Sequence, residues 1–141
     1  MIQARTPERV SELIKKGLDG GTDAFAIQID QLEREYRTES CYRVFFEKMG
    51  GKPVYVTDYR NNMSTGMTDG ELADELLTLA KSGAALVDVM SDLYCPSKDE
   101  ITRDSAADAK QRELINKIHS YGAEVLMSSH TYRFLNFDEV R

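Results

Sequence analysis

The sequence of 141 residues lacks the features that mark several classes of protein. Its net charge is −6 and it has no basic cluster, so binding to the phosphate backbone of nucleic acids is not expected. No apolar run approaches the ~20 residues that a membrane-spanning helix needs, and Met1 is not followed by a signal-peptide pattern. We therefore expect neither a nucleic-acid partner nor a membrane partner.

Cysteine is also scarce in the chain. The two cysteines, Cys41 and Cys95, lie far apart and fit no metal-binding spacing. We predict reduced thiols, a cytoplasmic location, and neither a metal nor another cofactor. With 41% apolar and 30% charged residues, the composition is that of a globular domain that can bury a core. Since no repeat or linker interrupts it, residues 1–141 are predicted to form a single domain.

Four helices are predicted from their caps and from apolar residues at helical spacing. Thr6, Pro7 and Glu8 supply the hydroxyl, the proline and the acid that commonly begin a helix. Thr68 and Glu71 form a capping box for the third helix. The predicted helices span residues 6–19, 38–49, 68–82 and roughly 105–121.

Short apolar runs alternate with these helices and predict strands over residues 24–29, 53–57, 85–90 and 123–130. The last run, from Ala123 to His130, has no helical period, so we expect a buried parallel strand covered on both faces. Ile2 and Ala4 fit the tail of a further strand. Strands that alternate with helices predict an α/β fold of parallel βα repeats. The order of elements fits a partial (β/α)8 barrel (TIM barrel) better than a complete open sheet.

Polar side chains stand at the predicted carboxyl ends of the strands, where α/β proteins place their reacting groups. The residues concerned are Gln28, Asp30, Asp58, Arg60, Asp88, Asp92, Ser128 and His130. An arginine can grip a carboxylate with two hydrogen bonds, and a histidine can take and return a proton near neutral pH. Together these groups suit proton abstraction from a small carboxylated substrate.

Each of these candidates also has a simpler interpretation. A histidine after a strand is more often a hydrogen-bonded loop residue, and Arg60 could form a salt bridge with Asp58 or a neighbour. For Asp30 a loop or helix-capping carboxylate is the commoner role. Asp88, in the middle of a strand, is costly to bury unless it is paired, so we expect it to face a polar barrel interior.

Three segments of the chain resemble a known family in collinear order. Residues 25–30 (FAIQID), 56–60 (VTDYR) and 125–130 (VLMSSH) resemble type I 3-dehydroquinate dehydratase, the Schiff-base dehydroquinase of the shikimate pathway. That family is a (β/α)8 barrel. In it a lysine forms an imine with the ketone of 3-dehydroquinate and a histidine moves the proton during loss of water. The resemblance implies that His130 is the general acid/base and that Arg60 contacts the substrate carboxylate or hydroxyls.

The chain departs from the family in its second-strand motif and in its lysines. The family has a glutamate and an arginine where this chain has Ala26 and Gln28, whereas Asp30 matches the acid that closes the motif. Gln28 and Asp30 are thus the other expected substrate contacts. The resemblance places the imine-forming lysine on a strand beyond Arg141. The lysines at 15, 16, 52, 81, 110 and 117 precede a strand or lie on helices, so we expect the chain alone to be inactive.

Three functions remain open at this point. The first is a dehydroquinase-type lyase that dehydrates 3-dehydroquinate to 3-dehydroshikimate. The second is a non-catalytic relative that binds a small polyhydroxy carboxylate. The third is a metal-dependent barrel enzyme that uses His130 with Asp88 or Asp92. It is disfavoured because one histidine and scattered acids make a poor ligand set.

The strand count also bears on assembly. Part of a barrel has two unpaired strand edges, and its apolar faces lose the opposing half of the core. We expect the exposed apolar residues to include Phe25, Ile27, Ile29, Val54 and Val56. Exposed edges and an apolar face favour self-association, so the prediction is a homodimer or larger oligomer.

Overall fold

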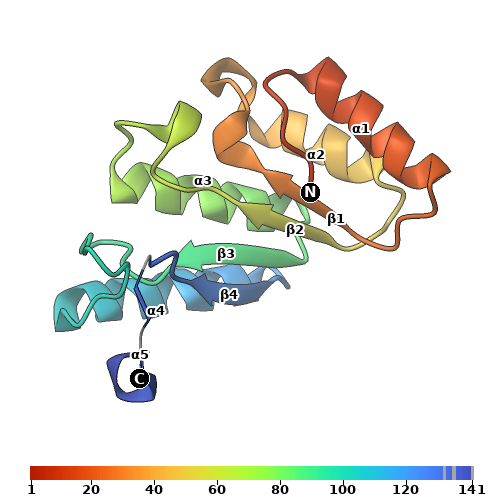
Figure 1. Cartoon of the computed structure of the whole chain (residues 1–141). Helices are drawn as coiled ribbons and strands as arrows, with labels where there is room; N and C mark the ends of the chain where they lie inside the picture. The colour runs from red at the N-terminus through yellow and green to blue at the C-terminus, as the bar shows by residue number, and fades with distance from the viewer. Residues whose placement is uncertain (132, 135, 141) are drawn as a thin grey trace.

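The computed structural model describes residues 1–131, 133–134 and 136–140, and it has the expected α/β fold. Four parallel strands, β1 (Phe25–Gln28), β2 (Val54–Thr57), β3 (Leu86–Met90) and β4 (Glu124–Ser128), form one sheet in chain order (Figure 1). The helices are α1 (Pro7–Asp19), α2 (Glu39–Lys48), α3 (Asp69–Ser82), α4 (Ser105–Ser120) and the short α5 (Phe137–Val140). The prediction of parallel βα repeats is confirmed.

The capping signals in the sequence mark the helix starts correctly. The Thr6 hydroxyl accepts a hydrogen bond from the backbone N–H of Arg9 at the start of α1. The backbone N–H of Glu71 donates to the Thr68 hydroxyl (3.2 Å), and the N–H of Thr68 donates to the Glu71 carboxylate (2.7 Å). Helix α3 ends before Gly83, whose φ of 112° lies in the left-handed region that favours glycine.

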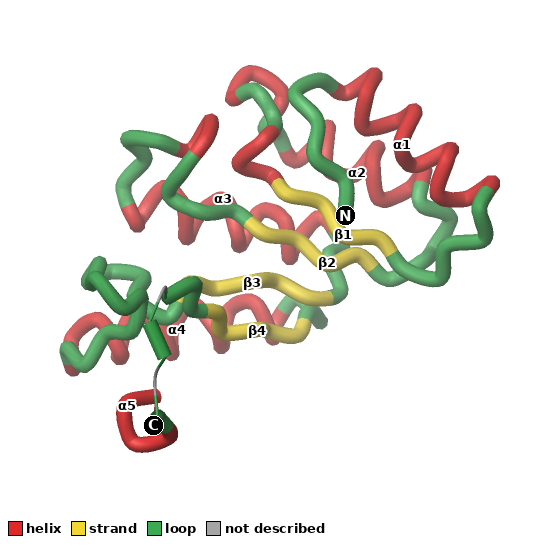
Figure 2. Tube along the Cα trace, in the orientation of Figure 1, coloured by secondary structure: helices red, strands yellow, loops and turns green. Residues whose placement is uncertain are grey.

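All four long helices lie on one side of the sheet. Because the strands are parallel and in chain order, right-handed crossovers place every connecting helix on the same face. Helices α1 to α4 accordingly pack side by side in chain order (Figure 2). A doubly wound sheet would have helices on both faces. The observed arrangement is compatible with part of a (β/α)8 barrel.

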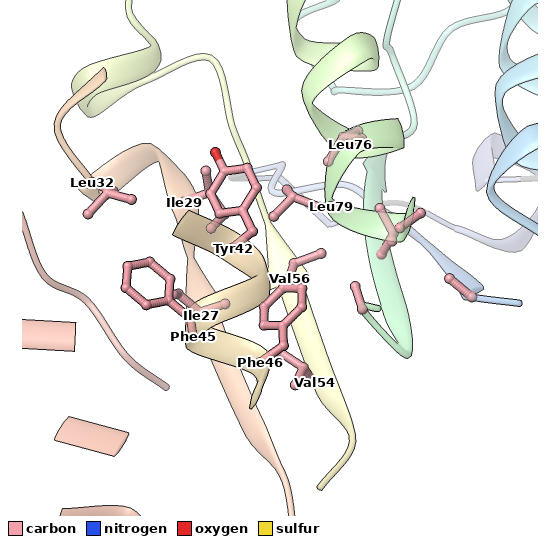
Figure 3. Packing of buried hydrophobic residues seen from close by; sticks show 14 of the residues in the cluster. Ile27, Ile29, Leu32, Tyr42, Phe45, Phe46, Val54, Val56, Leu76 and Leu79 are labelled. Atoms are coloured by element: carbon pink, nitrogen blue, oxygen red, sulfur yellow. The ribbon is translucent and has the colours of Figure 1, made fainter. Parts of the chain in front are cut away.

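The helix-covered face of the sheet holds the apolar core. Ile27 and Val56 are neighbours in the strand register, and both are buried. They meet Phe45 of α2 and Leu79 of α3 in one cluster (Figure 3). The expectation that the apolar residues of β1 and β2 would lack half of their core is therefore wrong. The residues concerned, all buried, are Phe25, Ile27, Ile29, Val54 and Val56.

The opposite face of the sheet is the open one. The register places Ala26, Tyr55 and Leu86 on this face, since each pairs with the next across the strands, and all three are only partly buried. In a closed barrel this would be the face that points inward. Alternation along each strand, with period two, decides which side chains the helices cover.

Strand β4 is less covered than predicted. It ends at Ser128 and lies at the edge of the four-stranded sheet. Glu124 is exposed, and Leu126 and Met127 are 43% and 41% exposed. The prediction that residues 123–130 form a strand covered on both faces is thus wrong. An apolar run has the same pattern in an edge strand as in a central one, so the sequence did not reveal the edge.

The other edge of the sheet is partly paired. Ile2 forms a parallel bridge with Ile27 of β1: its N–H donates to the Ala26 carbonyl (2.6 Å) and its carbonyl accepts from the Gln28 N–H (3.0 Å). Ile2 and Ala4 are both buried, in agreement with the expectation of a strand tail. Among the described residues, no helix is both long and apolar enough to cross a membrane.

Candidate functional site

A pocket of about 500 Å³ lies where the strands end at their carboxyl side. Its lining includes Gln28, Arg60 and His130, three of the four residues predicted to form the site. They come from the ends of β1, β2 and β4, which are far apart in sequence but end at the same edge of the sheet because the strands run parallel. The full lining is Gln28, Tyr59, Arg60, Asn61, Met90, Asp92, Pro96, Ser97, Glu100 and His130.

His130 is held by Glu100, a residue that the sequence analysis did not single out. The Glu100 carboxylate accepts a hydrogen bond from the backbone N–H of His130 (2.6 Å), and the same oxygen lies 3.3 Å from the ring nitrogen Nδ1. A carboxylate only accepts, so Nδ1 carries the proton in this contact and Nε2 is left to act as a base. The His130 side chain is 52% exposed at the pocket.

The backbone of Glu100 is itself unusual. Its φ of 53° lies in the left-handed region, which costs energy for a residue other than glycine. Strained backbone of this kind is often found at functional sites. Glu100 lies in the long loop between β3 and α4, where no periodic pattern indicates the position of a side chain. The sequence therefore held no signal for it beyond its charge.

The ring of Tyr59 packs against the ring of His130. The two ring centroids are 4.7 Å apart and the ring planes meet at 80°. The Tyr59 hydroxyl donates to Asp88 Oδ2 (2.8 Å). Tyr55 donates to the same oxygen, and the Ser128 hydroxyl donates to Asp88 Oδ1. Asp88 is buried and faces polar partners, as the sequence predicted.

Burial, followed by the hydrogen bond to Asp88, raises the pKa of both Tyr55 and Tyr59 above the ordinary value of 10.0. Both phenols therefore keep their protons near neutral pH and remain donors to Asp88. We name the group formed by Tyr55, Tyr59, Asp88 and Ser128 the hydroxyl cluster. It joins β2, β3 and β4 on the open face of the sheet.

Arg60 lines the pocket, but two carboxyl groups already occupy most of its guanidinium. Its Nε and Nη2 donate to the two oxygens of Asp69 (2.7 and 3.1 Å). Its Nη1 donates to Asp92 Oδ1 (2.7 Å) and its Nη2 to the Asp92 carbonyl (3.0 Å). The predicted salt bridge exists, with Asp69 and Asp92 and not with Asp58. Of the five N–H groups of an arginine, one remains for a ligand.

Asp58 lies away from the pocket, in a buried ionic group. Its Oδ1 accepts from the Ser64 hydroxyl (2.6 Å) and lies 3.7 Å from Nη1 of Arg37. The same nitrogen is 2.9 Å from Glu75, which also accepts from the Tyr42 hydroxyl. We call these five residues the Arg37 cluster. They join the loops after β1 and β2 to α2 and α3.

The Arg37 cluster has two acids for one cation. Burial, together with the nearby charge of Glu75, raises the pKa of Asp58 to about 8, although Ser64 and Arg37 oppose the rise. Asp58 Oδ2 has no hydrogen-bond partner among the described residues. Asp58 therefore holds its proton at neutral pH and has a structural role.

Asp30 acts on the pocket through Gln28. It is fully buried and does not line the pocket, contrary to a direct substrate contact. Its Oδ2 accepts from Gln28 Nε2 (3.0 Å) and from the side-chain amide of Asn62. The Gln28 carbonyl oxygen in turn accepts from Gln3 Nε2 (2.6 Å). These bonds orient the Gln28 amide, which does line the pocket.

Among the described residues, no lysine lines the pocket. Lys98, however, lies in the loop between β3 and α4, between the lining residues Ser97 and Glu100, and was not among the lysines considered from the sequence. Its side chain is exposed. Lys98 is therefore the lysine to examine first in any test for imine formation.

The metal hypothesis gains no support from the geometry. In the part of the chain that the structure describes, no three His, Cys, Asp or Glu side chains are placed to hold one metal ion. Three hydroxyls donate to the Asp88 carboxylate. The Asp92 carboxylate already accepts hydrogen bonds from Arg60 and from the backbone N–H of Ser97 (2.8 Å).

Fold and pocket together define a class: a protein of parallel βα repeats with a polar pocket at the strand ends and an oriented histidine in it. Compared with known proteins, the chain matches no family model, and no curated protein is significantly similar to it. Its function is therefore inferred from the site itself.

Proposed function

We propose that the chain is part of a (β/α)8 barrel of the dehydroquinase type. In this proposal the strand-end pocket binds a small polyhydroxylated carboxylate such as 3-dehydroquinate, and His130 transfers the proton. One observation carries the proposal: Gln28, Arg60 and His130 line one pocket, and Glu100 holds Nδ1 of the histidine. Gln28, Arg60 and His130 belong to the segments that carry the family resemblance, whereas Glu100 lies outside them.

The chemistry follows from the free ring nitrogen of His130. Nε2 takes a proton from the carbon next to the ketone, and the electron pair of that C–H bond forms a carbon–carbon double bond. The C–O bond to the neighbouring hydroxyl breaks, and the leaving oxygen takes the proton from His130 and departs as water. A positioned acid/base of this kind typically contributes about 10²–10⁴-fold to a rate.

The step needs an electron sink that the pocket does not supply. In the resembling family, an imine between a lysine and the substrate ketone has that role. The lining residues include no lysine. We therefore expect the chain alone to bind the substrate and to dehydrate it at best slowly.

The lining favours hydroxyl groups over the carboxylate of the ligand. Asp92 and Glu100 are acidic, and Arg60 has one N–H left to donate. Gln28, Asn61 and other polar side chains can exchange hydrogen bonds with hydroxyls. Recognition thus rests on the hydroxyls, with a weak contribution from the carboxylate.

A second function, a non-catalytic binding protein for the same class of molecule, is favoured by the lack of a lysine in the lining. The two functions share the pocket and differ in turnover. A cytoplasmic location, the absence of nucleic-acid and membrane partners, and self-association of the chain belong to the proposal as well.

Titration of the purified chain with 3-dehydroquinate, followed by calorimetry, tests the binding. We expect saturable binding that weakens at least tenfold in Gln28→Ala, because the oriented amide is lost, and stays unchanged in the control Gln31→Ala, whose side chain does not line the pocket. Ultraviolet absorbance of the enone product and borohydride trapping test turnover. We expect little enone and no trapped adduct.

Two results would contradict the proposal in different ways. A lack of saturable binding would remove the pocket as the ligand site. A trapped adduct with rapid dehydration, both lost in Lys98→Ala, would show that this chain is a complete lyase with Lys98 as its nucleophile.

A further inference from the structure

We infer that Tyr59 is a positioning residue for His130, fixing the tilt of the imidazole ring while Glu100 fixes its tautomer. The inference deepens the proposed function and rests on it, because it concerns the group that is to move the proton. It assigns Tyr59 no contact with the reacting atoms.

His130 needs a second support. Its side chain is 52% exposed, and its polar contacts are with Glu100, a loop residue. A single hydrogen bond at Nδ1 constrains the ring plane only in part, because combined changes of χ1 and χ2 can tilt the ring and keep that bond. Proton transfer requires a fixed direction for Nε2, since small displacements at a reacting centre cost rate steeply.

Tyr59 supplies this support by ring contact. The centroid distance of 4.7 Å and the angle of 80° are those of an edge-to-face aromatic pair. Such a pair defines the orientation of one ring relative to the other. The tilt of His130 is therefore as well fixed as Tyr59 is.

Tyr59 is itself anchored by hydrogen bonding. Its hydroxyl donates to the buried carboxylate of Asp88 (2.8 Å), which also binds Tyr55 and Ser128. Asp88 lies within β3, and Ser128 lies at the end of β4, two residues before His130. The hydroxyl cluster thus ties the Tyr59 ring to the same strand that presents the histidine. A phenylalanine would keep the ring and lose this anchor.

The test uses nuclear magnetic resonance of the histidine ring protons in the substrate-free chain. The chain has two histidines, so His119, in the last turn of α4, is an internal reference in every spectrum. We expect the ring current of Tyr59 to displace the His130 signals. In Tyr59→Leu this displacement should disappear, whereas the His119 signals should stay in place.

Tyr59→Phe and Tyr55→Phe form the matched pair, because each removes one hydroxyl from Asp88 and only Tyr59 contacts His130. Tyr59→Phe should reduce the displacement and speed the acylation of His130 by diethyl pyrocarbonate. Tyr55→Phe should do neither. If Tyr59→Leu does not fold, this pair alone decides the matter.

Equal effects of Tyr59→Phe and Tyr55→Phe, or an unchanged His130 signal in Tyr59→Leu, would overturn the inference. Since no substrate is present, these results do not depend on whether the pocket binds 3-dehydroquinate. A failed titration with a confirmed displacement would leave Tyr59 a positioning residue in a site with another ligand.

Discussion

In the half of the molecule built on β1 and β2, Asp58 lies buried among residues of α2, α3 and their flanking loops. In the half built on β3 and β4, Asp88 lies on the open face and accepts hydrogen bonds from three hydroxyl groups. The first aspartate belongs to the buried Arg37 cluster, which holds loops and helices together. The second supports a ring that touches His130.

The difference between the two halves shows that the strand face decides the role of an acidic residue. On the helix side the side chains are buried, so a charge needs a buried counter-charge or a proton. On the open side, two tyrosine hydroxyls and a serine hydroxyl are sufficient partners for the Asp88 carboxylate. One of these tyrosines, Tyr59, lines the pocket. The Arg37 cluster thus belongs to the scaffold, whereas the hydroxyl cluster supports the candidate site, to which the ends of β1 and β2 also contribute Gln28 and Arg60.

The largest effect should come from Arg37→Met, which removes the only cation of the Arg37 cluster. Glu75 would then lack its buried counter-charge and Asp58 its neighbouring cation, and breaking a buried ion pair in this way costs about 3–5 kcal/mol. Urea unfolding followed by circular dichroism measures the loss. The matched control is Arg43→Met, which breaks the exposed pair with Glu39 and should leave the midpoint unchanged. Equal losses would refute a special role for the buried cluster.

A second effect should appear as pH dependence in the same half. In the folded chain the pKa of Asp58 is about 8, against an ordinary value of 3.8. The folded state therefore keeps a proton that the unfolded chain releases, so this contribution to stability is full below pH 4 and is lost as the pH rises to about 8. The free energy of unfolding should fall by up to about 1.4 kcal/mol per pH unit in this window.

Asp58→Asn sharpens this second prediction because an amide stays neutral at every pH. Its unfolding free energy, measured in urea from pH 4 to pH 9, should have a flatter profile than that of the wild type. Parallel profiles would mean that Asp58 titrates as an ordinary carboxyl and that the two halves do not differ in this respect.

The smallest change in stability should come from the open half, where β4 forms the edge. Leu126 and Met127 are exposed, so replacing both with glutamine should alter stability by no more than about 0.5 kcal/mol. It should, however, lower self-association, which light scattering with gel filtration detects at micromolar concentration. Val44→Gln, at an exposed apolar residue of α2, is the control and should not change assembly. A wild-type chain that is monomeric under these conditions would refute the proposed homo-oligomer.

Several features of this protein follow from local sequence alone. Thr6, Thr38 and Thr68 begin helices, as their caps predict, and the alternation of helical and strand patterns predicts parallel βα repeats. His130 was placed at a strand end for the same reason. Caps and periodicity depend on residues within one or two turns of the chain, so they can be read without knowing the fold.

The tertiary structure decided which groups meet across long sequence separations. It paired Arg60 with Asp69 and Asp92 in place of Asp58, and it brought Glu100 to His130 from a loop 30 residues earlier. It also decided which face of the sheet is open and that β4 lies at the edge. The physical reason is that such contacts depend on loop conformation and strand register, which short-range patterns do not encode.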